Sequence, residues 1–178
     1  MQTRQLGFTD LHLTTVGFGA ASIGGGPAYG GAERDTTESI ATIHRALDLG
    51  INWIDVAPAY GRGRAEELVG RALAERSERI AVATKCGWRW RDDGRSYASL
   101  KADSIREEVE TSLRRLDVDV IDLYQVHWPR PDEDLEEGWG AIADLIDEGK
   151  VRYAGASNFS VAQLKRVQAI HPVSALQP

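Results

Sequence analysis

Six short apolar runs rich in β-branched residues recur along the chain, and the gaps between them carry apolar residues at helical spacing. The first residues of the runs lie 35, 29, 40, 31 and 22 positions apart, close to the length of one βα unit. This alternation predicts an α/β fold with a parallel sheet. The expected strands are Val16–Ala20, Ile51–Val56, Ile80–Lys85, Val120–His127, Val151–Ala156 and Val173–Gln177.

The expected helices have recognisable ends. Asp35 and Glu38 form a capping-box pattern, and Gly50 supplies the stop of the helix that follows. Ser160 and Gln163 repeat the capping pattern near the end of the chain. Five helices are predicted in total, and their apolar stripes are assigned to the core rather than to chemistry.

Two segments lie outside this βα pattern. Arg4–Phe8 and Leu11–Thr14 flank a turn and predict a small β-hairpin, which in a barrel would close the floor. Trp88–Leu100 is the longest irregular segment, and because it follows a strand's carboxyl end we expect it to cover a ligand. No linker or low-complexity stretch divides the chain, so residues 1–178 are predicted to form a single domain.

Composition excludes several classes of partner. The 178 residues include 21 Lys and Arg against 27 Asp and Glu, which gives a formal charge of −6 and argues against a nucleic-acid partner. No apolar run approaches the ~20 residues that span a bilayer, so no membrane partner is expected. One cysteine cannot form an internal disulfide, and no secretion signal opens the chain, so a cytoplasmic location is predicted.

Polar side chains stand where the expected strands end. In parallel βα folds the ligand site forms at the carboxyl ends of the strands. Asp55 closes the second strand, Lys85 the third and His127 the fourth, while Tyr60 follows Asp55 in its loop. A sheet that curls into a barrel would bring these four side chains to one mouth. Together they suit general acid catalysis on a carbonyl group.

Charge suggests a role for each of the four side chains. An adjacent Lys85 ammonium is expected to lower the pKa of the Tyr60 phenol, which is ordinarily near 10. Asp55 would supply the counter-charge that a buried ammonium needs. His127 would hydrogen-bond to a carbonyl oxygen and orient it.

Taken singly, these residues have structural alternatives: a turn cap for Asp55, a surface aromatic for Tyr60 and a core histidine for His127. Lys85 is more telling, because lysine is rarely buried unless it is paired. Their joint placement at successive strand ends favours a site. The three other histidines show no ligand spacing, so no metal is expected.

Seven blocks of sequence carry a family pattern, in order and with consistent spacing. The blocks are Gly50–Gly61, Glu66–Gly70, Ala83–Lys85, Ile121–Trp128, Gly149–Arg152, Gly155–Ser160 and Leu176–Pro178. With them the chain resembles the aldo-keto reductases, close to the bacterial and stress-protein branch of that family.

This resemblance implies a reaction. Tyr60 would be the proton donor, Lys85 and Asp55 would tune it, and His127 would orient the substrate carbonyl. Members of the family bind NADPH across the barrel mouth and pass its hydride to aldehydes or ketones without a metal. The implied cofactor is therefore NADPH/NADP+, and the implied partner is a small carbonyl substrate.

The resemblance also implies binding residues. A carboxamide such as that of nicotinamide needs both donors and acceptors, which Ser157, Asn158 and Gln177 provide. Trp88 and Trp128 fall where the family lines its substrate pocket with aromatic residues. After Gly19 the family commonly has a threonine and an aromatic, whereas this chain has two alanines. The implied cofactor contacts are Gly19, Ala20, Asp55, Ser157, Asn158 and Gln177.

Length sets the chain apart from this family. A (β/α)8 TIM-type barrel typically needs about 250 residues, and this sequence offers about six strands and five helices. The last two βα units are missing, with the residues that grip the 2′-phosphate. The open sheet edges would invite self-association. We therefore expect either a piece of a longer gene product or a second chain that completes the wall, with weakened cofactor binding.

Two alternatives stay open from the sequence. A non-catalytic subunit or truncated pseudoenzyme would keep the barrel surface for assembly and turn over nothing. A doubly wound, flavodoxin-like sheet would suit the length better, but it would leave the four polar residues without a shared mouth.

Overall fold

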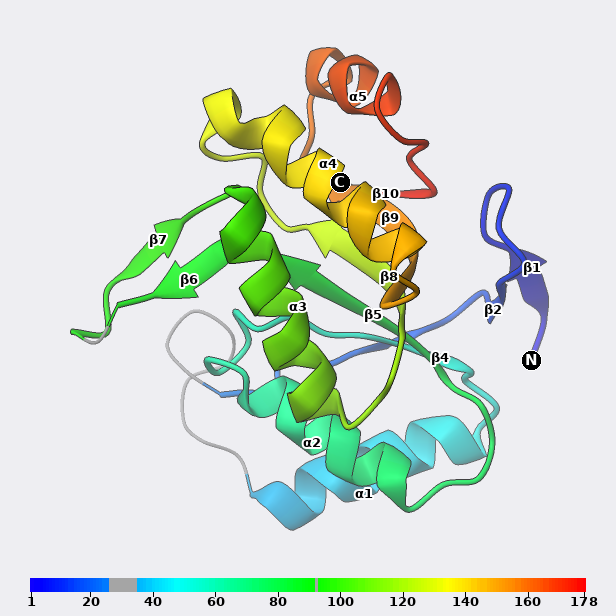
Figure 1. Cartoon of the computed structure of the whole chain (residues 1–178). Coiled ribbons are helices and arrows are strands. Elements are labelled where there is room, and N and C mark those ends of the chain that lie inside the picture. Colours follow the sequence, from blue (N-terminus) through cyan, green and yellow to red (C-terminus); the bar gives the residue numbers. More distant parts are fainter. Residues whose placement is uncertain (26–34, 92) are drawn as a thin grey trace.

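A six-stranded parallel sheet forms the centre of the computed structural model, which describes residues 1–25, 35–91 and 93–178 (Figure 1). The strands lie side by side in chain order, which turns every crossover the same way and puts the helices on one face. A doubly wound sheet reverses its order, so the flavodoxin-like alternative is excluded. In order across the sheet the strands are β3 (Phe18–Gly19), β4 (Trp53–Asp55), β5 (Ala81–Cys86), β8 (Ile121–Val126), β9 (Val151–Ser157) and β10 (Ala175–Gln177).

Five helices connect these strands, as the sequence predicts. The Asp35 carboxylate accepts from the Glu38 N–H at 2.9 Å, and the Ser160–Gln163 capping box forms in both directions. The short 3-10 turn η1 (Asp132–Asp134) leads into the fourth helix. The helices are α1 (Thr36–Asp48), α2 (Arg64–Ala74), α3 (Ala102–Leu116), α4 (Leu135–Asp147) and α5 (Val161–Gln168).

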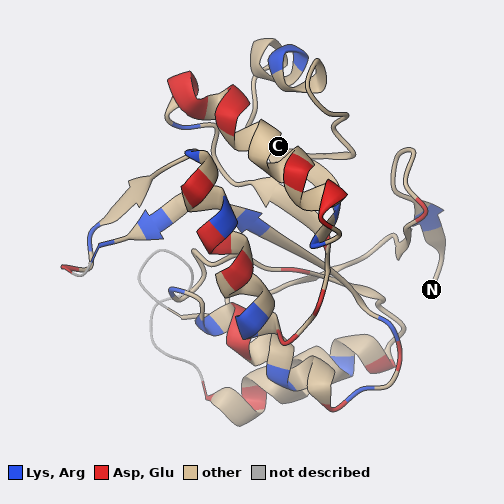
Figure 2. Cartoon of the chain, viewed as in Figure 1, with Lys and Arg blue, Asp and Glu red and all other residues tan. Residues whose placement is uncertain are grey.

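The core lies between these helices and the sheet. Ile54, Tyr124 and Trp139 are fully buried in it, and each large apolar side chain contributes about 1.5–3 kcal/mol on burial. Figure 2 shows where the charges lie: side chains of both signs are interspersed along α3, α4 carries acidic residues only, and the strands of the large sheet are mostly uncharged. None of the helices in the described ranges is long and apolar enough to cross a bilayer.

The N-terminal hairpin, β1 (Thr3–Gln5) with β2 (His12–Thr14), is attached to the start of β4. The Asn52 amide accepts from the Thr14 N–H and donates to the His12 carbonyl, both at 2.8 Å. The Trp53 indole N–H donates to the Thr14 carbonyl at 2.9 Å. These bonds hold the hairpin at the amino end of the sheet, as predicted.

The segment Trp88–Leu100 corrects one prediction. It is not irregular: β6 (Trp88–Trp90) and β7 (Ser96–Ala98) pair as an antiparallel hairpin, with residue 92 outside the described residues. Gly94 has a φ of 81°, which suits the left-handed turn that glycine tolerates best. The charged residues of the segment suggest a loop, but its alternating Trp and Tyr residues favour strands.

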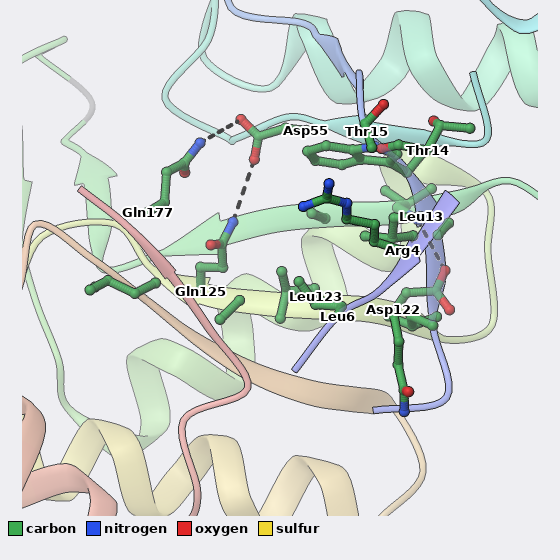
Figure 3. Close-up of a pocket in the computed structure, with 18 of the residues that line it drawn as sticks. Arg4, Leu6, Leu13, Thr14, Thr15, Asp55, Asp122, Leu123, Gln125 and Gln177 are labelled. Atoms are coloured by element: carbon green, nitrogen blue, oxygen red, sulfur yellow. Dashed lines mark hydrogen bonds between the residues drawn. The ribbon is translucent and has the colours of Figure 1, made fainter. Parts of the chain in front are cut away.

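The concave face of the sheet is open. β3 and β10 are the edge strands among the described residues, so the barrel is the incomplete one that the sequence predicts. A hollow of about 610 Å³ extends along this face (Figure 3). Asp55 and Gln177 lie at its carboxyl end, and Arg4 and Asp122 at its amino end.

Candidate active site

Lys85 is the centre of the candidate site. Its ammonium donates to both carboxylate oxygens of Asp55 at 2.8 Å and to the Tyr60 hydroxyl at 3.3 Å. It also donates to the carbonyl of Val56 at 3.2 Å. The Lys85 side chain is only 2% exposed, and an ammonium this deeply buried is stable only when a counter-charge and acceptors surround it. Asp55 on β4 meets Lys85 because the two strands are parallel neighbours.

Tyr60 holds its proton firmly. Burial raises its pKa to about 12, and the negative charge of Asp55 adds to the rise. The sequence predicts the opposite direction because it weighs the charge of the Lys85 ammonium and not the burial of the phenol, which disfavours the charged phenolate. Asp55 binds that ammonium through both oxygens, which leaves little net positive charge to favour the phenolate. Tyr60 is therefore a neutral phenol at pH 7, the form that a general acid needs.

His127 lies beside Tyr60. The two rings meet edge to face with their centroids 6.0 Å apart. Burial lowers the pKa of His127 to about 4, and the nearby positive charge of Lys85 contributes to the shift. A neutral imidazole keeps one N–H donor at pH 7, which suits a carbonyl oxygen. Trp128 stacks on His127 at 6.4 Å and is 37% exposed, so an aromatic face borders the site.

A second group of polar side chains stands at the ends of β9 and β10. The Asn158 amide donates to the His127 carbonyl at 2.9 Å and to the Ser157 hydroxyl at 3.0 Å. The Asn158 N–H donates to the Gln177 carbonyl at 3.0 Å. These bonds join β8, β9 and β10 at the edge that carries His127, so both groups share one end of the sheet.

Gln177 has an unused acceptor. Its amide nitrogen donates to Asp55 at 3.4 Å, but its buried Oε1 has no hydrogen-bond partner among the described residues. A buried acceptor without a donor is costly and is usually paired when a ligand binds. The N–H groups of a carboxamide could donate to this oxygen, and the Ser157 hydroxyl could make a second contact to the same carboxamide. These residues therefore fit a nicotinamide.

Gln125 was missed by the sequence reasoning. Its side-chain amide donates to Asp55 at 3.4 Å from β8, opposite the bond from Gln177 (Figure 3). Asp55 thus accepts from three side chains on three other strands. The available signal was alternation: Gln125 is two residues before His127, so both point to the same face of the strand.

Three predicted contacts are placed differently from the rest. Gly19 is exposed at the end of β3, level with Asp55. Ala20 is fully buried in the core and its N–H is bonded to the Asp55 carbonyl, so neither its side chain nor its amide faces the mouth. Trp88 lines a separate cavity of about 250 Å³ with Pro58 and Arg62, on the helix side of β5.

Parallel strands in chain order whose carboxyl ends gather titratable side chains are typical of β/α barrels. The family comparison is more specific: the model of the Aldo/keto reductase family matches residues 15–178. The chain therefore belongs to the aldo/keto reductase family, as its sequence blocks indicate.

Two relatives show how much of a family member the chain represents. It is 42% identical to the aldo-keto reductase YhdN of Bacillus subtilis (strain 168), over 100% of this chain and 53% of that protein. It is 39% identical to the NADH-specific methylglyoxal reductase of Escherichia coli (strain K12), over 93% of this chain and 54% of that protein. The chain spans about half the length of these relatives.

Solved structures give the same picture. The glycerol dehydrogenase AKR11B4 from Gluconobacter oxydans superposes with a TM-score of 0.89 and 39% identity, over 99% of this chain and 54% of that one. The holo form of the aldo-keto reductase AKR11C1 from Bacillus halodurans gives 0.87 and 35%, over 99% and 56%. The described fold thus corresponds to about half of each of these longer chains.

Proposed function

We propose that this chain carries the proton-donating half of an NADPH-dependent reductase that converts aldehydes or ketones to alcohols. One observation supports this most directly: the buried Lys85 ammonium is bonded to Asp55 and to the Tyr60 hydroxyl at once. In this proposal residues 1–178 act as one domain, in the cytoplasm, on a small carbonyl substrate. Nucleic acid and membrane are not partners.

The chain's own residues act at the substrate oxygen. The His127 imidazole donates to the carbonyl oxygen and orients it. A dihydronicotinamide, when bound, would supply the hydride, and Ser157, Asn158 and Gln177 would hold its carboxamide. The Tyr60 O–H bond breaks and the proton goes to the oxygen as its negative charge develops. The phenolate left behind is stabilised by the Lys85 ammonium and regains a proton from solvent.

A binding and turnover assay tests this proposal. The purified chain is titrated with NADPH and with NADH by fluorescence, and reduction of an activated aromatic aldehyde is then followed. We expect binding of NADPH and slow turnover. NADH is the necessary comparison because the E. coli relative is named as NADH-specific. Stronger binding of NADH than of NADPH would overturn the choice of cofactor. If the aldehyde is reduced with neither NADPH nor NADH present as donor, or not reduced with either, the enzyme assignment for this chain alone is overturned.

A non-catalytic subunit is the second candidate, and the open hollow of about 610 Å³ favours it. In this case a complementing wall covers the concave face, either from more of the same polypeptide or from another copy of the chain. Light scattering tests the second source: we expect a concentration-dependent dimer, and a strictly monomeric chain would contradict self-association. Dimer formation without nucleotide binding would favour the subunit over the enzyme.

A further inference from the structure

A buried carboxyl group lies directly behind the candidate site. Glu108 on α3 is 7% exposed, and its Oε2 accepts from the Gly87 N–H at 3.0 Å. Its Oε1 accepts from the Ser104 hydroxyl at 3.3 Å. The proposed proton transfer does not use this group. Burying a carboxylate is costly unless it is paired and hydrogen-bonded, so the two groups that bond to Glu108 are of interest.

One peptide unit connects Glu108 to the site. The peptide bond between Cys86 and Gly87 donates its N–H to Glu108 and accepts at its carbonyl from the His127 N–H, at 3.0 Å each. The carboxylate of Glu108 therefore fixes a peptide plane that is bonded to the His127 backbone, and aligned hydrogen bonds of this kind polarise one another. Lys85 is joined to this peptide through Cys86, the next residue in the strand.

The turn at this peptide has little freedom of its own. Gly87 has a φ of 88°, where other residues are strained, and an added Cβ would lie 2.9 Å from Leu100. A second tether runs from the same helix, because Arg89 donates to Ser104 at 3.3 Å and to Glu107 at 2.7 Å. The end of β5 is thus set by α3.

We propose that Glu108 is a positioning residue: its ionised carboxylate holds the Cys86–Gly87 peptide, and so Lys85 and His127, in the productive arrangement, and its protonation relaxes that arrangement. The proposal rests on the proposed function for its effect on turnover. It adds a pH-dependent control that lies outside the mouth of the site.

The surroundings of Glu108 suit such a control. Burial raises the pKa of Glu108 to about 7. Four neighbours favour the ionised form and oppose this rise: the amides of Gly87 and Trp88, the charge of Arg89 and the Ser104 hydroxyl. Burial also raises the pKa values of Cys86 and Tyr124 well above their usual range, so both face Glu108 as neutral groups.

Solvent can reach this carboxyl group. Glu108 lines the cavity of about 250 Å³ that also holds Trp88. The other charged groups lining it are Arg62, Arg89, Glu107 and Arg115, of which Arg89 is paired with Glu107 and Arg115 with the buried Glu66. Protons therefore have a route from the helix side. Above neutrality the charged form makes the stronger bonds to the amides, and below it these bonds weaken.

The test is a pH titration of the backbone amides of Gly87 and His127 by NMR, on the whole chain. We expect both amide signals to titrate together near pH 7 in the wild type and in E107Q, which removes the adjacent exposed carboxylate and its ion pair with Arg89 but keeps Glu108. Both should stop titrating in E108Q. In S104A the midpoint should move upward, because a bond to the ionised form is lost. Unchanged titration of both amides in E108Q, or no titration in the wild type, would overturn the proposal.

Kinetics supply the second readout. If the chain reduces the aldehyde, kcat should fall about tenfold as the pH drops through 7, with little change in KM, and E108Q should be low and flat over the same range. S104A retains the carboxyl group and decides the matter if E108Q does not fold. If no variant turns over, the proposed function fails while the amide titration still decides the role of Glu108.

Discussion

At the carboxyl end of the sheet, Asp55 accepts from Lys85, Gln125 and Gln177 beside a phenol. At the amino end, Asp122 accepts from the Val82 N–H at 3.0 Å, from Arg152 at 2.7 Å and from Arg79. Both carboxylates lie on strands and line the same hollow. They differ in what their partners can do with a proton.

The partners of Asp122 are guanidinium groups and a backbone amide, none of which serves as a general acid or base at neutral pH. Arg152 extends this network to Asp10 in the N-terminal hairpin at 2.6 Å. At the other end, Lys85 contacts the Tyr60 phenol and His127 stands next to it. In barrels, residues at the carboxyl end serve chemistry and those at the amino end serve stability, and the two networks follow that division.

The largest expected difference between the two ends is in turnover. Tyr60→Phe removes only the proton donor, so carbonyl reduction should fall by about 10²–10⁴-fold while nucleotide binding stays nearly unchanged. The measurements are single-turnover reduction and fluorescence titration. Asp122→Ala serves as the matched change at the amino end and should leave the rate constant intact. A Tyr60→Phe variant with wild-type turnover would remove the phenol from the mechanism.

The next effect is acid sensitivity at the carboxyl end. The pKa of His127 falls from 6.5 to about 4 on folding, so the unfolded chain binds a proton in this interval that the folded chain does not. Stability is therefore lost as the pH drops from 6.5 towards 4, by about 3 kcal/mol at most. His127→Asn should flatten this part of the curve when unfolding is measured by urea titration at several pH values. An identical slope in both proteins would contradict the neutral imidazole.

A smaller effect is expected for stability at the amino end. Asp122→Ala leaves the buried Val82 N–H without its acceptor and removes the carboxylate that pairs with the Arg152 side chain. The free energy of unfolding should fall by about 1–3 kcal/mol. Urea denaturation followed by circular dichroism measures it. A variant as stable as the wild type would show that Asp122 does not anchor this end.

The smallest effect is expected for the outermost charge of this network. Asp10→Asn removes the exposed negative charge that pairs with Arg152 but keeps an acceptor oxygen and the backbone of the hairpin. Exposed ion pairs contribute little and are screened by salt. The variant should unfold at nearly the wild-type urea concentration, with any difference vanishing at high salt. A large, salt-independent loss would mean that the hairpin depends on this pair.

The sequence predicts the strands, helices and first hairpin because their signals are local. Capping residues, β-branched runs and the βα period each act within a few residues. It also selects Asp55, Tyr60, Lys85 and His127 as neighbours, because parallel strands end at one edge. Strand boundaries are less well predicted: the first expected strand, Val16–Ala20, is reduced to Phe18–Gly19.

What the sequence does not predict depends on contacts between distant segments. The direction of the Tyr60 pKa shift reverses because folding buries the phenol, and the negative charge of Asp55 beside it adds to the rise. The role of Glu108 depends on a bond to Gly87 across the helix–sheet layer. The sequence around Tyr60 or Glu108 does not indicate these contacts. A glutamate on a helix, for example, is most often at the surface.

Cys86 makes it possible to measure opening of the structure at the end of β5. Its thiol is the only one in the chain and is buried beside Lys85. A thiol-alkylating reagent therefore cannot reach it in the folded chain, so the rate of labelling measures how often the structure around the end of β5 opens.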